Sequence, residues 1–183
     1  MKFVKSTWRN VVLAIGVLIG VGLLATLALR EPSLPDFAAA GPVQSVPAET
    51  MAVVSGRDLQ NIIAGLEGQP VVVNIWGSWC PPCRAEMPLL QRVAESYEGE
   101  AVLLGVAVRD DPKVAARFLQ DFAITYPNLY DPSGDVLRAL EVRVFPTTYV
   151  FDANGVIVSR VDGGVSEQRI VGMIEDALRE SES

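Results

Sequence analysis

From about residue 51 onward, short apolar runs alternate with segments whose apolar positions recur at helical spacing. Two of the runs, 71–76 and 101–108, are almost continuously apolar, as in strands that are covered on both faces. The last two runs are separated by an Asn-Gly turn, which predicts a hairpin. The predicted strands are 51–54, 71–76, 101–108, 126–131, 147–152 and 156–161.

Capping residues mark the starts of several predicted helices. Ser55 precedes the first helical segment, Asp111 with Pro112 begins the third, and Ser166 precedes the last. Strands and helices alternate first, and a hairpin and a helix follow. This order predicts an α/β fold with a central mixed β-sheet, parallel in its centre and antiparallel at one edge, flanked by helices on both faces. The predicted helices are 56–66, 81–97, 112–122, 134–141 and 167–179.

The first fifty residues have a different pattern. Residues 11–29 carry no charge and are mostly apolar, and as a helix they would span roughly 28 Å, close to the thickness of a bilayer core. Positive charges precede them, so we predict a transmembrane signal-anchor helix with residues 1–10 in the cytoplasm. A Pro-rich linker, residues 30–50, then joins this helix to a domain over residues 51–183.

A cleaved signal peptide is the alternative interpretation of this apolar segment. Thr26–Ala28 resembles the small-residue cleavage site that such a peptide requires. Under both interpretations the domain lies outside the cytoplasm. With the anchor retained, the protein is a single-pass protein of the cell membrane whose domain faces the periplasm or the cell wall.

Composition excludes several classes of function. The chain has 15 basic residues, 22 acidic residues and no histidine. Residues 1–30 contain four of the basic residues and no acidic one, so the remainder is strongly acidic. An acidic domain repels a phosphate backbone, and we therefore expect no binding of nucleic acid. Two cysteines without histidine supply too few ligands for a zinc site, so we predict no metal and no cofactor.

Both cysteines of the chain lie in the stretch "WCPPCR", between a predicted strand and a predicted helix. The first turn of a helix carries a partial positive charge, which stabilises a thiolate and lowers its pKa. We therefore predict that Cys80, at an exposed lip, is the nucleophile and that Cys83 is the resolving thiol. The pair would cycle between a dithiol and a redox-active Cys80–Cys83 disulfide through a mixed disulfide. Pro81 and Pro82 stiffen the connection between the two thiols.

The stretches "NIWGSWCPPCRAEMP" and "FPTTYVFDANG" together resemble the thioredoxin superfamily. More narrowly, they resemble the membrane-anchored TlpA/ResA-like thiol–disulfide oxidoreductases, a group that includes the CcmG-type thioredoxins of cytochrome c maturation. The resemblance covers about residues 51–180 and implies a thioredoxin-like fold. It also implies a cis peptide bond before Pro146, which would face the disulfide; an ordinary edge-strand proline is the alternative.

The resemblance implies a substrate groove around the two cysteines. Phe145 and Pro146 would form this groove, together with Trp79, Pro81 and Pro82. For Trp79 two interpretations stay open, because the indole could cover the nucleophile and contact substrate or could simply pack.

Glu86 follows Cys83 by three residues and lies on the same face of the predicted helix. The resemblance implies a possible proton relay at this position, because a buried carboxylate could accept the proton of Cys83. The alternative is a solvated acid that only favours the helix dipole. Asn74 stands where general thioredoxins have a buried aspartate, which favours Glu86 as the relay.

These features predict an extracytoplasmic thiol–disulfide oxidoreductase that acts as a disulfide reductase. The resemblance implies protein thiols or disulfides as substrates, apocytochrome c among them, and a membrane electron donor as partner. A general disulfide oxidase or isomerase of secreted proteins is the first alternative. A peroxiredoxin-type peroxidase is a second, although Gly77 stands where such enzymes have a threonine. A binding module without catalytic activity is the third.

Overall fold

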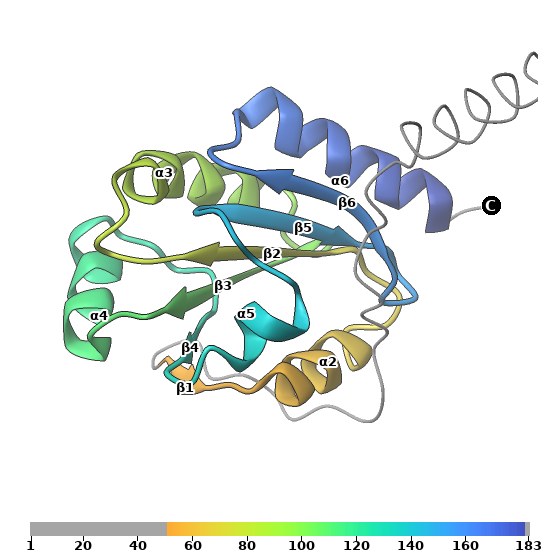
Figure 1. The fold of residues 1–183 in the computed structure, drawn as a ribbon. Helices are drawn as coiled ribbons and strands as arrows, with labels where there is room; N and C mark the ends of the chain where they lie inside the picture. The colour runs from red at the N-terminus through yellow and green to blue at the C-terminus, as the bar shows by residue number, and fades with distance from the viewer. Residues whose placement is uncertain (1–50, 182–183) are drawn as a thin grey trace, which may run out of the picture. The chain divides into compact units, whose positions relative to one another are not determined.

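A mixed sheet of six strands forms the centre of the domain (Figure 1). A computed structural model describes residues 51–181. The strands are β1 (Ala52–Val53), β2 (Val71–Trp76), β3 (Val102–Val108), β4 (Asn128–Asp131), β5 (Thr147–Phe151) and β6 (Ile157–Asp162). They lie in the order β1-β4-β3-β2-β5-β6. Neighbours from β1 to β2 are parallel, whereas β5 is antiparallel to both β2 and β6.

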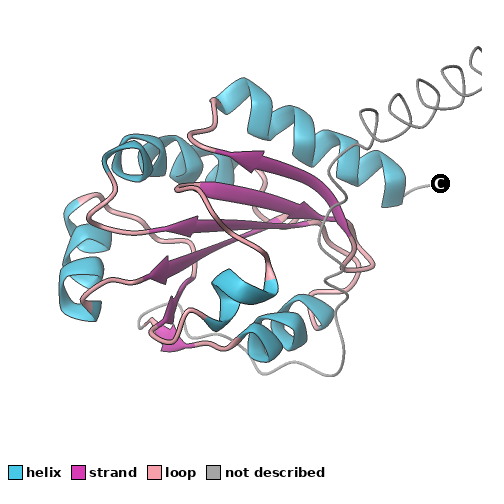
Figure 2. Cartoon of the chain, viewed as in Figure 1, coloured by secondary structure: helices cyan, strands magenta, loops and turns pink. Residues whose placement is uncertain are grey.

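Helices cover both faces of this sheet (Figure 2). The helices are α2 (Gly56–Ala64), α3 (Pro81–Ser96), α4 (Pro112–Asp121), α5 (Asp135–Ala139) and α6 (Glu167–Ser181). Helices α3, α4 and α6 share one apolar cluster with the sheet, and α2 and α5 share the other. Alternation along β2 supplies both clusters, because Val72 and Trp76 belong to the first and Val71, Val73 and Ile75 to the second.

The predicted α/β architecture is confirmed, with small changes in the bounds of its elements. The predicted helix 134–141 is shortened at both ends to α5, Asp135–Ala139. Gly134 instead has a left-handed backbone with φ of 72°, so the helix begins only at Asp135. β4 begins at Asn128 rather than at residue 126, and Pro127 immediately precedes it.

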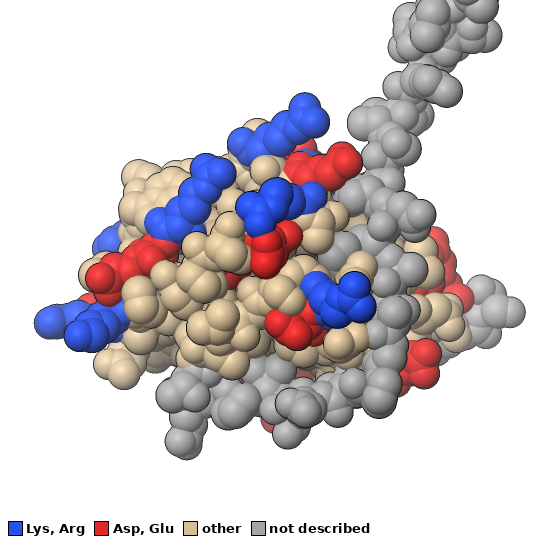
Figure 3. Space-filling model, turned by 60° about the horizontal axis from the view of Figure 1, so that its bottom comes forward, with Lys and Arg blue, Asp and Glu red and all other residues tan. Residues whose placement is uncertain are grey.

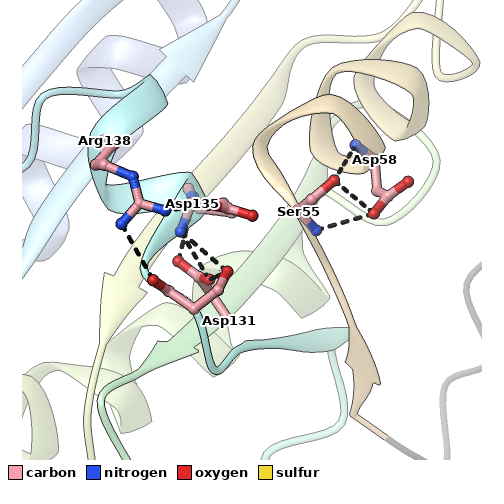
Figure 4. A network of polar contacts seen from close by, with 7 residues as sticks. Ser55, Asp58, Asp131, Asp135 and Arg138 are labelled. Carbon is pink, nitrogen blue, oxygen red and sulfur yellow. Dashed lines mark hydrogen bonds and ion pairs between the residues drawn. The ribbon is translucent and has the colours of Figure 1, made fainter.

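The predicted helix caps are also present. Ser55 and Asp58 form a reciprocal capping box at the start of α2 (Figure 4). At the start of α4, the Asp111 carboxylate accepts hydrogen bonds from the backbone N–H groups of Lys113 and Val114. Both caps pair amide groups that the first turn of a helix otherwise leaves without a partner.

The predicted transmembrane helix, 11–29, and the predicted linker, 30–50, lie outside the described residues. Between residues 51 and 181, no helix has the length and apolar character needed to cross a membrane.

A close contact across the sheet fixes the end of β2, where the cysteine motif begins. The indole Nε1 of Trp76 donates a 2.9 Å hydrogen bond to the side-chain Oδ1 of Asn128. This oxygen lies directly over β3, since a Cβ atom on Gly105 would be only 1.8 Å from it. Only glycine at this position leaves room for the Asn128 amide.

Candidate redox-active site

Cys80 and Cys83 form a disulfide at the start of α3, with a Cα–Cα distance of 5.3 Å. Cys80 is the N-cap residue of the helix, and its sulfur accepts a hydrogen bond of 3.3 Å from the backbone N–H of Cys83. The same N–H and the helix dipole would stabilise a thiolate on Cys80 in the reduced protein. Pro81 and Pro82, which occupy the first two helical positions, are exposed.

The disulfide is packed into the protein rather than placed at its surface. Only 3% of Cys80 is exposed, and Cys83 is completely buried. Both belong to the apolar cluster between the sheet and α3, and Phe145 packs against this cluster. The prediction that Cys80 lies at an exposed lip is therefore wrong for the oxidised protein, because the N-cap residue turns inward with the helix that it begins.

Trp79 and Phe145 form an aromatic pair next to the cysteines. Their ring centroids are 5.2 Å apart in an edge-to-face arrangement. The Trp79 indole also donates a 3.3 Å hydrogen bond to the carbonyl of Val108, yet 49% of the residue stays exposed. The peptide bond between Phe145 and Pro146 is cis, as expected, and Pro146 is buried at the start of β5. Trp79 thus packs and at the same time leaves about half of its surface exposed to solvent.

The loop between β2 and α3 is tied to the segment after β3. The Asp110 carboxylate accepts hydrogen bonds of 2.5 Å from the backbone N–H of Ser78 and 2.7 Å from its hydroxyl. On the other side, Arg84 donates to the carbonyl of Ser78 at 3.4 Å. Ser78 is thereby tied both to the segment after β3 and to α3. Nothing in the sequence pattern indicated Asp110, since its role depends on the parallel pairing of β2 and β3.

Glu86 is a buried acid, so the alternative of a solvated first-turn carboxylate is wrong. Only 3% of the residue is exposed, because this face of α3 packs on the sheet. Its Oε1 accepts a 2.8 Å hydrogen bond from the Asn74 side chain, and its Oε2 accepts a 2.9 Å bond from the backbone N–H of Val165. The Asn74 amide also donates to the Thr148 hydroxyl at 3.0 Å. Among the described residues, the side-chain Oδ1 of Asn74 has no hydrogen-bond partner.

This environment changes the affinity of Glu86 for a proton. Burial raises its pKa, while the hydrogen bonds from Val165 and Asn74 act in the opposite direction. Tyr126 is also buried, and burial together with the nearby Glu86 charge raises the pKa of its hydroxyl. A carboxyl with a raised pKa, one helical turn after Cys83, is chemically suited to accept the proton of that thiol.

The sequence pattern singled out Glu86 but missed its partners. Thr148 and Asn74 lie directly opposite one another in the antiparallel pair of β5 and β2. Val165 lies 79 positions away from Glu86 along the chain, just before α6. Once the register of β2 and β5 is known, the Thr148 contact could be predicted, whereas the Val165 contact could not.

Gly77 completes the loop before the cysteines. A Cβ atom at this position would lie 2.6 Å from the indole nitrogen of Trp79. A threonine, which a peroxidase of the peroxiredoxin type would have here, requires the indole to move.

Comparison with known proteins places this site in a family. Residues 35–160 match the AhpC/TSA family. The chain belongs to this family. The chain is 34% identical to the thiol:disulfide interchange protein DsbE of Pseudomonas fluorescens biotype C, over 87% of each chain. It is also 32% identical to the thiol-disulfide oxidoreductase ResA of Oceanobacillus iheyensis, over 62% of this chain and 60% of that relative.

A solved structure is similar to this chain as well. A DsbF homologue from Corynebacterium diphtheriae is 35% identical to this member of the AhpC/TSA family, with a TM-score of 0.59 over 62% of this chain and 75% of that chain. The predicted membership of a ResA- and CcmG-like group of thioredoxin-fold oxidoreductases is thereby confirmed. The chain spans only 60% of the length of the ResA relative.

Proposed function

We propose that this chain catalyses thiol–disulfide exchange with protein substrates and works as a disulfide reductase. The observation that carries the proposal is the Cys80–Cys83 disulfide at the start of α3, where the Cys83 N–H contacts the Cys80 sulfur. A disulfide that closes so short a loop adds little to stability, so its use is chemical rather than structural. The names of the DsbE and ResA relatives support the same chemistry.

The reaction transfers two electrons from the dithiol to a substrate disulfide. The Cys80 thiolate attacks one substrate sulfur, a Cys80–substrate bond forms, and the substrate S–S bond breaks to release the first substrate thiolate. Cys83 then loses its proton and attacks the Cys80 sulfur. The Cys80–Cys83 bond forms, the mixed disulfide breaks, and the second substrate thiolate leaves. The two protons of the enzyme dithiol balance those that the two substrate thiols gain.

Glu86 acts in the second step. Cys83 is completely buried, so solvent cannot readily take its proton. Glu86, buried one turn later on the same helix, receives that proton while Cys83 attacks. The raised pKa of the Glu86 carboxyl fits this role, because it makes the protonated form accessible closer to neutral pH.

The N-terminal sequence and the resemblance to CcmG-type proteins together support a location and a substrate. We propose that residues 11–29 anchor the domain outside the cytoplasm, where a membrane donor reduces the Cys80–Cys83 disulfide. The substrate is then apocytochrome c, whose haem-attachment cysteines must be reduced before haem is joined to them. Protease treatment tests the location. The protease should cut the domain in cells whose cytoplasmic membrane is intact and accessible to it. Cutting only after this membrane is broken would contradict the proposed location.

The direction of electron flow is tested by the reduction potential of the full-length protein in redox buffers. A reductase should have a potential of about −270 mV, whereas a value of about −120 mV would make it an oxidant. The substrate is tested with an oxidised peptide that carries a Cys-x-x-Cys-His sequence. The reduced protein should yield two peptide thiols per turnover. No thiols from this peptide or from any other disulfide peptide would contradict the proposed function.

A further inference from the structure

A cavity of about 540 Å³ with three arginines in its lining lies between the end of β3 and α5. It is bounded by the residue after β3, the start of α5 and the segment that leads from α5 to β5. Arg109, Arg138 and Arg143 line it, together with a single acidic residue, Glu141. Figure 3 shows basic side chains standing out along the upper part of the face that comes forward in that view, with acidic ones among them.

Two walls of this cavity continue directly into the aromatic pair next to the disulfide. Arg109 follows Val108, whose carbonyl accepts the hydrogen bond of the Trp79 indole. Arg143 lies two positions before Phe145, whose ring contacts the same indole. A chain that lies over Trp79 and Phe145 can therefore extend into the cavity.

The charges that line the cavity are not all neutralised. Arg138 pairs with Asp135 and donates to the Ser133 carbonyl at 3.1 Å (Figure 4). Arg109 and Arg143 are exposed, and within residues 51–181 neither of them takes part in an ion pair or a side-chain hydrogen bond. Two guanidinium groups next to the site thus remain free to bind an anionic partner.

The wall that carries Arg138 is held firmly. Asp131 is fully buried, and its carboxylate accepts hydrogen bonds from the backbone N–H groups of Asp135 and Val136 at 3.0 Å each. These bonds fix the first turn of α5 at the end of β4. One wall of the cavity is therefore a helix whose first turn is held in place by a buried carboxylate.

The net positive charge of the cavity lining is opposite in sign to the net charge of the chain. The chain has a net charge of −7, and its acidic residues all lie beyond residue 30. At physiological ionic strength charges are screened beyond about 8 Å, so a bound group experiences the arginines more strongly than the distant acids. Guanidinium groups bind carboxylates through paired hydrogen bonds.

We propose that this cavity, the arginine subsite, binds an acidic segment of the protein substrate that flanks its reactive cysteine. The inference rests on the proposed thiol–disulfide exchange and adds a substrate class to it. Val144, 46% exposed, lies between Arg143 and the aromatic pair and accommodates an apolar residue between the cysteine and the acidic segment. The subsite favours substrates that carry aspartate or glutamate within a few residues of the disulfide.

The test compares three disulfide peptides that differ only in the residues flanking the cysteines: Asp-Asp, Asn-Asn or Lys-Lys. The reduced full-length protein, held in a non-ionic detergent, is mixed with each peptide at low ionic strength, and the second-order rate constant of thiol release is measured. The acidic peptide should react about tenfold faster than the basic one, since charge complementarity acts mainly on association. This preference should decrease in 0.5 M salt.

The variant R109E/R143E should lose the preference for the acidic peptide. The matched control is R117E/R169E, which changes the net charge equally at two exposed arginines on α4 and α6, helices that pack on the opposite face of the sheet from α5. The Asn-Asn peptide should react at the same rate with the wild-type protein and with the matched control. An equal preference in both variants would overturn the subsite alone. Failure of the wild-type protein to react with any peptide would overturn the proposed function and the subsite with it.

Discussion

Glu86 of α3 and Asn74 of β2 are joined by a 2.8 Å hydrogen bond inside the apolar cluster that also contains the disulfide. Through Thr148 and Val165 the same small network reaches β5 and the segment before α6. Four parts of the chain thus meet at one buried carboxyl. A change in the charge of Glu86 must alter the energy of all these contacts, and the first two predictions use this relationship.

Replacement of Glu86 with glutamine should change how stability depends on pH. Burial raises the Glu86 pKa above its ordinary value of 4.5, so the folded protein binds the proton more tightly than the unfolded chain. The stability that this carboxyl contributes is complete below pH 4.5 and is lost as the pH rises through the folded pKa. Urea unfolding of the oxidised proteins should show wild type losing stability relative to Glu86→Gln above pH 4.5. Parallel pH curves would contradict the raised pKa.

Replacement of Asn74 with alanine should raise the pKa of Glu86 further. The Asn74 amide favours the charged form of Glu86, and its removal also leaves a buried acceptor with one donor fewer, at a cost of about 1–3 kcal/mol. The pH profile of the step in which Cys83 releases substrate should therefore shift to higher pH. Thr148→Val is the matched control, because it removes another contact of the same amide without touching Glu86. Equal shifts in both variants would exclude a specific effect of Asn74.

Replacement of Cys83 with alanine should trap substrates. Without the resolving thiol, the mixed disulfide on Cys80 persists and can be recovered on non-reducing gels. Cys80→Ala should trap far less, because Cys83 is completely buried and cannot reach a substrate sulfur. Equal trapping by both variants would show that the two thiols do not have separate roles.

Replacement of Gly105 with alanine should destabilise the domain by several kcal/mol. The added Cβ would lie 1.8 Å from the Asn128 side-chain oxygen, which holds the Trp76 indole. The cost should be smaller when Asn128 is already alanine, because the main clash is then gone. Unfolding of the four proteins of this double-mutant cycle measures the coupling. Additive effects would mean that the Asn128 amide does not occupy the space above Gly105.

Much of the architecture could be predicted because it depends on local sequence. Ser55 and Asp111 are short polar residues directly before helical segments, and their caps form within three residues along the chain. The cysteine pair at a junction between strand and helix likewise needs only local order. The resemblance to a known group then added the cis bond before Pro146, which local propensity does not specify.

The depth and the partners of the site could not be predicted, because they depend on how distant elements dock. Burial of Cys80 results from the packing of α3 on the sheet, not from the motif itself. The contact of Glu86 with Val165 needs the position of the segment before α6. The juxtaposition of Arg109 and Arg143 likewise requires the loop after β3 to lie near the segment before β5.

Val165 lies in the segment that connects β6 and α6, and its backbone N–H donates a hydrogen bond to Glu86. This bond couples the position of α6 to the buried acid beside the cysteines. A change in the packing of α6, such as one caused by a neighbour that binds to this helix, alters the position of the Val165 amide and with it a hydrogen bond to the acid. We therefore expect the rate of electron transfer to respond to the position of α6 even when both sulfurs are unchanged.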